Sequence, residues 1–252
     1  MELRAVAFDI GNTLIDDRTN QMESIRRLAQ ELACEGVVTS SEEFVSTYIG
    51  VNRANNVPFL SHTFGDARFF ESTLRRLGIT SISASKALQR YRKILMARST
   101  IDVDIVAALT AVRNRGLRTA VLSNESVQRV DALFRKTRID QLFDVVVVSE
   151  AAGIEKPDRR IFERCCWELG VDGSEAALFG DNEIADGACK QTGMLFVLVT
   201  GYKHPDWGWE NGESYEPDYT VDRITPDTVE SFLGFAADLS GRRDGGRHDR
   251  SN

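Results

Sequence analysis

The stretch that decides the fold runs from Arg4 to Asp16 and reads RAVAFDIGNTLID. It begins as a run of apolar residues and ends in one carboxylate, Asp9, with a glycine, an asparagine and a threonine soon after it. This order predicts a buried strand followed by a tight turn. Open parallel sheets bind their ligands at the carboxyl ends of their strands. Asp9 is therefore either an ordinary turn residue or part of a site, and its partners along the chain decide between the two.

Length and composition limit the class of protein. The chain has 252 residues, enough for one large domain or for a core with a smaller insert. A formal net charge of −7 argues against a general affinity for nucleic acid or for an anionic membrane surface. No run approaches the roughly 20 apolar residues that span a bilayer, and the first residues lack a signal-peptide pattern. We therefore expect a cytoplasmic protein, either a monomer or a homodimer.

The four cysteines do not have the spacing of a metal site. We interpret them as buried or neutral thiols because none forms a C-x-x-C pair. They are Cys34, Cys165, Cys166 and Cys189.

Apolar residues recur at helical spacing for some eighty residues after Asp17, which predicts four consecutive helices. Four helices between one strand and the next are typical of an inserted helical subdomain rather than of crossovers in a parallel sheet. We therefore expect a four-helix cap at residues 17–99 and a core made of residues 1–16 and 100–240. The last residues, 241–252, are glycine, charged and polar, and we expect them to be disordered.

Helices and strands alternate from Ile101 onwards. Buried strands are predicted at 117–122, 143–148, 176–179 and 195–199, with a possible short sixth strand at 219–221. This alternation predicts an α/β fold with a doubly wound, Rossmann-like parallel sheet covered on both faces.

Polar groups follow three of these strands, at ends that meet on one edge of the sheet. They are Asp9 with Thr13, Ser123 with Asn124, and Asp181. A fourth group, Lys156-Pro157-Asp158, comes from a loop and the start of a helix. This ordered set resembles the haloacid dehalogenase-like (HAD) hydrolase superfamily over roughly residues 3–233. The resemblance implies the same fold and a phosphoryl transfer.

The resemblance also implies a role for each side chain. Asp9 would be the nucleophile that forms an aspartyl-phosphate, and Ser123 would donate a hydrogen bond to a phosphoryl oxygen. Lys156 would neutralise charge between that oxygen and the Asp9 carboxylate. Thr13 and Asn124 complete the catalytic residues that we expect.

The cofactor implied by the resemblance is Mg²⁺, which prefers hard oxygen ligands. Asp9, the carbonyl oxygen of Gly11 and Asp181 would hold it, and Asp186 would be an alternate ligand or would support the ligands from behind. Asp186 lies one residue closer to the following Gly193 than is usual in the family. We expect a small phosphorylated metabolite as the substrate, with no nucleic acid and no membrane as partner, and assign its contacts to Asn12, Asn182 and His204.

Gly11 departs from the family pattern. Most phosphatases of the family carry an aspartate there, which protonates the leaving oxygen and then activates water. A positioned general acid or base contributes roughly 10²–10⁴ in rate. The substrate could have a good leaving group, such as an acyl phosphate, or another side chain could move the proton. The candidates for that second case are Glu125, Glu183, His62 and His204.

Two further explanations of Gly11 stay open, namely a different chemistry, of which there are two kinds, and the absence of catalysis. The chemistry could resemble that of 2-haloacid dehalogenases, whose second motif is similar to Leu122-Ser123-Asn124, although magnesium-free dehalogenases lack an acidic motif like Gly180-Asp181. It could also resemble that of phosphonatases, which need a lysine from the cap, here Lys86 or Lys93. Finally, the chain could be a binding protein that kept the fold.

Overall fold

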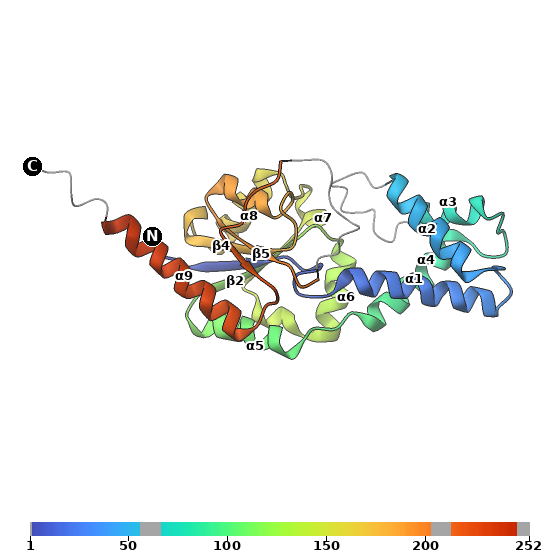
Figure 1. The fold of residues 1–252 in the computed structure, drawn as a ribbon, viewed down its shortest axis with the longest axis horizontal. Coiled ribbons are helices and arrows are strands. Elements are labelled where there is room, and N and C mark those ends of the chain that lie inside the picture. The colour runs from blue at the N-terminus through green and yellow to red at the C-terminus, as the bar shows by residue number, and fades with distance from the viewer. Residues whose placement is uncertain (1, 56–66, 203–212, 246–252) are drawn as a thin grey trace, which may run out of the picture. The chain divides into compact units, whose positions relative to one another are not determined.

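The computed structural model describes residues 2–55, 67–202 and 213–245 (Figure 1). In this part of the chain six strands form one parallel sheet in the order β3-β2-β1-β4-β5-β6. They are β1 (Ala5–Phe8), β2 (Arg118–Ser123), β3 (Val145–Val148), β4 (Ala176–Gly180), β5 (Leu195–Val199) and β6 (Tyr219–Val221). The predicted α/β fold with a doubly wound parallel sheet is confirmed.

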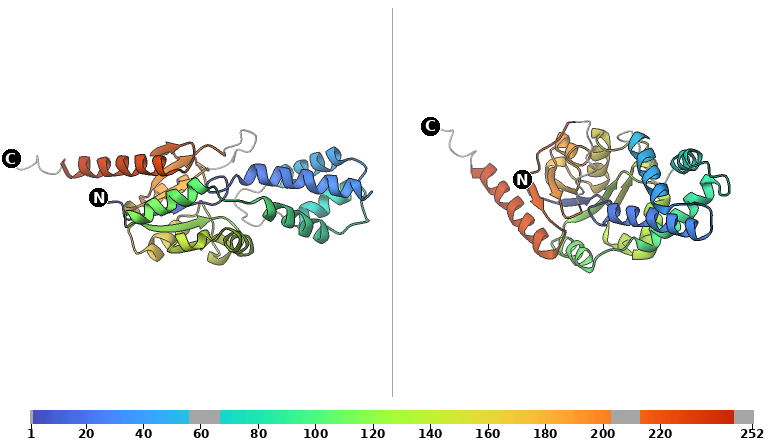
Figure 2. Two further views of the ribbon diagram at one scale, coloured as in Figure 1. Left: turned by 90° about the horizontal axis from the view of Figure 1, so that it is seen from below. Right: turned by 45° about the vertical axis from the view of Figure 1, so that its right-hand side comes forward.

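Helices cover both faces of the sheet (Figures 1 and 2). Side chains alternate along β1, so that Ala7 joins the cluster of Phe162 from α8 (Arg159–Leu169) on one face. On the other face Phe8 stacks on Phe179, with ring centroids 5.1 Å apart. Phe179 in turn meets Phe232 of α9 (Pro226–Gly245) edge to face. Helix α5 (Val103–Asn114) packs beside α9 on this face.

The remaining elements of the core are short. They are α6 (Val127–Thr137), α7 (Ser149–Ala152), η1 (Ile139–Leu142), η2 (Gly173–Glu175) and η3 (Gly187–Thr192). Between β4 and β5, where the alternation of helices and strands predicts a helix, the chain forms only the 3₁₀ segment η3, which Gly193 caps with φ 89°. Residues 182–186, which precede η3, form a tight loop.

Residues 16–100 form a compact unit of their own, and the other unit comprises residues 1–15 and 101–252. The described part of the first unit contains α1 (Asp17–Cys34), α2 (Ser41–Asn55), α3 (Ala67–Arg76) and α4 (Ala84–Arg98). Its centre is an aromatic cluster. The ring centroids of Tyr48 and Phe70 lie 5.0 Å apart, and the ring of Tyr91 packs against both. The hydroxyl oxygens of Ser40 and Ser83 accept hydrogen bonds from backbone N–H groups in the first turns of α2 and α4 and so cap these helices.

The C-terminal helix is longer than the sequence suggested. We expected disorder from Gly241, but α9 continues to Gly245, so the first residues of that stretch are helical. The hydroxyl of Ser240 donates to the carbonyl of Ala236, so the turn that leads into this stretch is helical as well. Residues 246–252 lie outside the described part of the chain.

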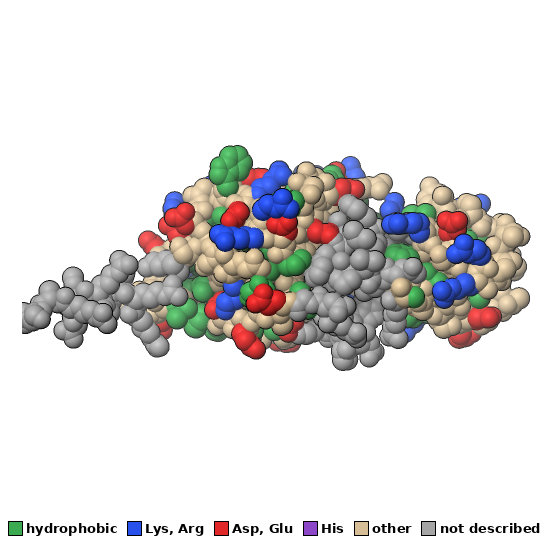
Figure 3. All heavy atoms as spheres, turned by 90° about the horizontal axis from the view of Figure 1, so that it is seen from above, with side chains coloured by type: hydrophobic (Ala, Val, Ile, Leu, Met, Phe, Trp, Pro, Cys, Tyr) green, Lys and Arg blue, Asp and Glu red, His purple; other side chains and the backbone are tan. Residues whose placement is uncertain are grey.

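The surface is mixed in charge. Acidic and basic side chains are interspersed over the face drawn in Figure 3. Among the described residues, no helix is both long and apolar enough to cross a bilayer. All four cysteines are free thiols, with Cys34 exposed and the other three buried.

Candidate active site

The candidate site lies at the carboxyl ends of β1 and β4. Asp9 directly follows β1, and its backbone N–H donates to the carbonyl of Phe179 on β4, at 2.9 Å. In the sheet, β1 and β4 are neighbours. The strand that follows β1 in the chain, β2, lies toward one edge of the sheet, and the strand that follows β4, β5, lies toward the opposite edge. Such a switch in direction opens the crevice in which doubly wound sheets bind their ligands.

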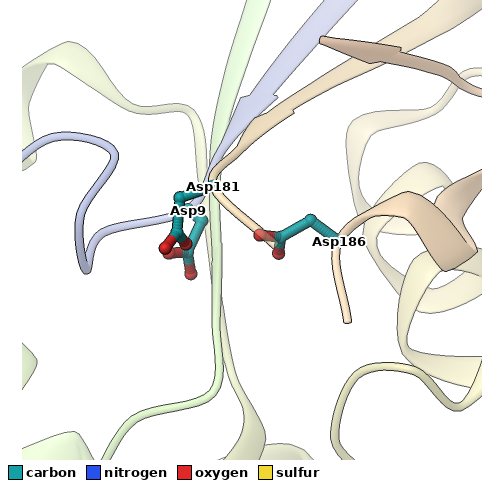
Figure 4. A group of neighbouring side chains, drawn as sticks. All are labelled: Asp9, Asp181 and Asp186. Atoms are coloured by element: carbon teal, nitrogen blue, oxygen red, sulfur yellow. The ribbon is translucent and has the colours of Figure 1, made fainter. Parts of the chain in front are cut away.

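Three carboxylates converge in this crevice. Asp9 and Asp181 lie side by side and Asp186 points toward them from the loop before η3 (Figure 4). One oxygen of each lies within 4.8 Å of the others. Since Asp9 and Asp186 are also buried, their negative charges repel one another in a poorly solvated space.

Lys156 supplies a cation to this cluster and is only 2% exposed. Its ammonium group donates to Asp9 Oδ1 at 2.8 Å, to Asp186 Oδ1 at 2.5 Å and to the carbonyl of Leu122 at 3.1 Å. Burial alone would lower the pKa of Lys156, but the charges of Asp186 and Asp9 raise it above its ordinary value. Lys156 therefore stays protonated, which was the state required for the predicted role.

The two other carboxyl groups are pushed toward protonation. Burial, followed by the charges of Asp186 and Asp9, raises the pKa of Asp181 well above its ordinary value. Burial also raises the pKa of Asp186 to about 6, against the opposing effect of Lys156. One ammonium thus does not balance three carboxylates, and the donor set of hard oxygens with excess negative charge fits a divalent cation.

Asn124 holds the backbone of Lys156 on both sides. Its Oδ1 accepts from the Lys156 N–H and its Nδ2 donates to the Lys156 carbonyl, both at 2.8 Å. The oxygen and the nitrogen of the Asn124 side-chain amide therefore both contact the backbone of Lys156 and fix its position. Ser123, the last residue of β2, is buried beside it.

The turn after β1 carries two more of the predicted residues. Asn12 adopts a left-handed conformation, with φ 52°, which asparagine tolerates better than most residues. Its Nδ2 donates to Asp181 Oδ2 at 3.3 Å, so Asn12 supports a carboxylate of the cluster. Thr13 is fully buried, and its hydroxyl lacks a hydrogen-bond partner among the described residues.

Of the two other residues assigned to the substrate, Asn182 lies in the described part of the chain. Asn182 Oδ1 accepts from the N–H groups of Ile184 and Ala185, at 2.9 and 2.8 Å, and so caps the loop that carries Asp186. Its contact with the substrate remains a prediction. His204 lies outside the described residues, and so does His62.

The described candidates for the missing acid differ in their surroundings. Glu125 accepts from Arg129 at 2.5 Å through Oε1 and from the Ser126 N–H at 3.2 Å through Oε2, so both its oxygens are engaged. The carbonyl of Glu183 accepts from the Tyr215 N–H, at 3.0 Å. Gly11 does not belong to the glycines with positive φ, so its backbone suits an L-residue.

Reasoning from sequence missed two contacts that shape this site. The carbonyl of Leu122 is the third acceptor of Lys156, and the Asn12 amide supports Asp181. A backbone carbonyl leaves no signal in the sequence. The sequence predicts that Asn12 belongs to the site, but it does not show which carboxylate the Asn12 amide contacts.

Added Mg²⁺ is expected to raise the midpoint of thermal unfolding, and this rise should shrink as the pH falls below about 6. A raised carboxyl pKa means that the folded protein holds a proton more tightly than the unfolded chain. Stability without metal therefore falls as the pH rises from the ordinary value of 3.8 toward about 6. Above that pH Mg²⁺ replaces the proton and stabilises by about 2.7 kcal/mol at one hundred times its dissociation constant.

Differential scanning fluorimetry at pH 5.0 and 7.5, with and without Mg²⁺, measures this effect. Asp181→Asn should weaken the response at pH 7.5, and Asp158→Asn, outside the cluster, should leave it unchanged. An equal rise at both pH values would contradict the assignment of Asp186 to the cation site.

Comparison with known proteins places these features in a family. A family model of haloacid dehalogenase-like hydrolases matches residues 3–188. Glyceraldehyde 3-phosphate phosphatase of Methanopyrus kandleri is 28% identical over 229 residues, which cover 88% of this chain and 94% of that protein. Phosphoglycolate phosphatase of Chromobacterium violaceum is 23% identical over 228 residues, covering 88% and 93%.

Haloacid dehalogenase-like hydrolase domain-containing protein 3 of Xenopus laevis is 33% identical over 230 residues, covering 85% of this chain and 91% of that one. Among solved structures, the L-2-haloacid dehalogenase of Xanthobacter autotrophicus superposes with a TM-score of 0.64 at 19% identity, covering 92% of this chain and 99% of that one. A HAD phosphatase from Thermococcus onnurineus gives 0.62 at 19%, covering 92% and 98%. At this identity the structures show a shared fold. Since the family model spans more than half of the chain, the protein belongs to the haloacid dehalogenase-like hydrolases.

Proposed function

We propose that the protein is a magnesium-dependent phosphatase that acts on a small phosphorylated metabolite through an aspartyl-phosphate on Asp9. The observation that carries the proposal is the convergence of Asp9, Lys156, Asp181 and Asp186 at the switch point of the sheet. Two relatives that match nearly the whole chain are named as phosphatases of small phosphorylated compounds, which supports the same class here.

The contacts of Asp9 suggest how the first step proceeds. Lys156 donates to Oδ1, which orients the carboxylate, and we assign the attack on phosphorus to Oδ2. As the bond between Oδ2 and phosphorus forms, the bond from phosphorus to the leaving oxygen breaks, and that oxygen keeps the electron pair. Ser123 is assigned to donate to a phosphoryl oxygen, and protonated Lys156 balances the charge beside it.

The second step restores Asp9. Water attacks phosphorus, the bond between phosphorus and Oδ2 breaks, and inorganic phosphate leaves with the oxygen from water. We assign the Mg²⁺ ligands to Asp9, Asp181, Asp186 and the carbonyl oxygen of Gly11. Bound there, Mg²⁺ would supply positive charge against the phosphoryl oxygens.

The helical unit of residues 16–100 follows β1 in the chain, at the position where we expect a cap. We assign substrate selection to it, since a closing cap excludes water and completes a binding site. The phosphonatase alternative needs a lysine from this unit, but Lys86 and Lys93 are both exposed on α4. Such lysines are ordinarily solvated surface residues. Phosphatase activity therefore remains the better supported chemistry.

Phosphate release tests this proposal directly. Purified protein with Mg²⁺ should release phosphate from p-nitrophenyl phosphate and from an acyl phosphate. Intact mass after acid quenching should show an adduct heavier by one phosphoryl group if the second step is slow. A protein that binds these compounds but forms neither free phosphate nor the adduct would be a binding protein instead.

Gly11→Asp is expected to raise turnover of alkyl phosphates by about 10²-fold, because it adds a proton donor at the position where the family pattern places an aspartate. The gain should stay at the lower end because the neighbouring residues do not support the new side chain. The measurement is kcat/KM for a series of phosphate esters whose leaving groups differ in pKa. The wild type should depend steeply on that pKa, and the variant should depend on it less.

The control for this series is Gly234→Ala, which changes a glycine in α9 that has open space around it. It should leave the dependence on leaving-group pKa as it is in the wild type. A shallow dependence in the wild type would mean that another side chain already transfers the proton, and His204→Ala and Glu183→Gln would then identify it.

A further inference from the structure

Asp186 folds its carboxyl group over the backbone of Gly180, the last residue of β4. A Cβ atom placed on Gly180 would lie 2.3 Å from Asp186 Cγ, 2.4 Å from its Oδ2 and 2.5 Å from its Cβ. All three distances are far below an ordinary van der Waals contact. Gly180 does not belong to the glycines with positive φ. The position therefore requires glycine because of space rather than because of backbone conformation.

Asp186 cannot give way without losing its own contacts. Its Oδ1 accepts from Lys156 at 2.5 Å, and its Oδ2 accepts from the Asn182 N–H at 3.1 Å. Its backbone N–H donates to the Asn182 carbonyl at 2.9 Å, which closes the short loop. A side chain at position 180 would therefore push Asp186 away from Lys156 and from the two other carboxylates.

We propose that Gly180 is a positioning residue of the cation site, because its missing side chain is the space that the Asp186 carboxylate occupies. Gly180 contacts neither substrate nor cation in this assignment and acts through Asp186. The inference rests on the proposed function, since it takes the three carboxylates to be the Mg²⁺ ligands. The proposal adds Gly180 to the site, because the lack of a side chain at this position leaves room for the Asp186 carboxylate.

A purely structural role for Gly180 is the competing explanation. The residue pairs with Leu198 of β5, so a substitution could loosen the sheet and lower stability without any specific effect on the cation. The two explanations differ in whether the effect of the substitution depends on the side chain at position 186.

The first measurement is Mg²⁺ affinity of Gly180→Ala, from calorimetric titration or from thermal unfolding at increasing Mg²⁺. Supporting shells around a metal typically contribute 10–100-fold in affinity, so we expect the dissociation constant to rise by about tenfold or more. Gly234→Ala should bind Mg²⁺ like the wild type. An unchanged Mg²⁺ affinity in folded Gly180→Ala would overturn the proposal.

The second measurement introduces Gly180→Ala into a variant that lacks the Asp186 side chain. Asp186→Gly removes the three atoms that lie nearest to the added Cβ, namely Cβ, Cγ and Oδ2 of Asp186. In that background Gly180→Ala should change Mg²⁺ affinity by less than about twofold, since non-additivity marks residues that act through one another. A further loss of about tenfold there would favour the purely structural role.

Folding provides a third readout. If Gly180→Ala alone does not fold, the double variant Gly180→Ala/Asp186→Gly should fold, and its failure to do so would reject the proposal. These measurements do not use turnover, so a wild type that binds Mg²⁺ but releases no phosphate would refute only the phosphatase assignment. A wild type that does not bind Mg²⁺ would overturn the inference about Gly180.

Discussion

Replacing Asp9 with asparagine is expected to abolish phosphate release, with a loss of about four orders of magnitude or more, as for other enzymes that lose their nucleophile. The amide has nearly the shape of the carboxylate but is not nucleophilic. It can still accept a hydrogen bond from Lys156, which now reaches Asp9 Oδ1 at 2.8 Å. The variant should therefore fold, and phosphate release at saturating Mg²⁺ is the measurement.

Asp158→Asn is the matched control for this change. Asp158 lies two residues from Lys156, but its carboxylate caps α8 and pairs with Arg160 at the surface. Asparagine is also a good N-cap, so activity and stability should stay close to wild type. If the wild type accumulates the phosphoryl adduct, the adduct should be absent from Asp9→Asn and present in Asp158→Asn. Phosphate release that survives Asp9→Asn would show that the nucleophile is another residue.

Lys156→Met is expected to lower both activity and stability. It keeps most of the side-chain volume but leaves the buried carboxylates of Asp9 and Asp186 without the ammonium that binds them both. Removing one partner of a buried ion pair costs about 3–5 kcal/mol. We expect a loss of about 10²–10³ in kcat/KM, since fixed positive charge beside the phosphoryl group is lost as well.

The pH dependence separates this effect from loss of packing. Asp181 and Asp186 have raised pKa values even beside Lys156, so without it they should take up protons more readily. The loss of stability should therefore be largest at pH 7.5 and smaller at pH 5, and Mg²⁺ should restore part of it. Urea unfolding at the two pH values measures this. A loss of equal size at both would point to packing alone.

Lys93→Met is the control for Lys156→Met and also tests the phosphonatase alternative. Lys93 is exposed on α4, so its replacement should change neither stability nor phosphate release. A loss of activity in this variant would favour a lysine-dependent cleavage of a carbon–phosphorus bond over the proposed chemistry.

The sheet was predictable because each buried strand is a short apolar run with a turn signal after it. In β1 all residues are apolar, so a strand buried on both faces is the simplest explanation. The sequence could not show that the segment after Asp181 forms a 3₁₀ turn instead of a helix. That outcome depends on Asn182. Its side-chain oxygen accepts from the N–H groups of residues 184 and 185, and its backbone carbonyl accepts from those of Asp186 and Gly187.

The site was predictable at the level of residue types and their order. Asp9, Lys156 and Asp181 could be grouped because parallel strands bring their carboxyl ends to one edge. The spacing around Asp186 departs from the family, yet the structure brings this residue into the cluster. The clamp of Asn124 on Lys156 was not predictable, since both of its hydrogen bonds go to backbone atoms that every residue carries.

The central position of β1 also determines when the nucleophile can be fixed during synthesis of the chain. Val6 pairs with Thr119 on one side and with Ala177 on the other, so both neighbours of β1 are made long after it. The helices of residues 16–100 have nearby partners and can fold while the ribosome is still making the sheet. We therefore expect β1 to be among the last strands to be fixed in the sheet, although it is made before both of its neighbours.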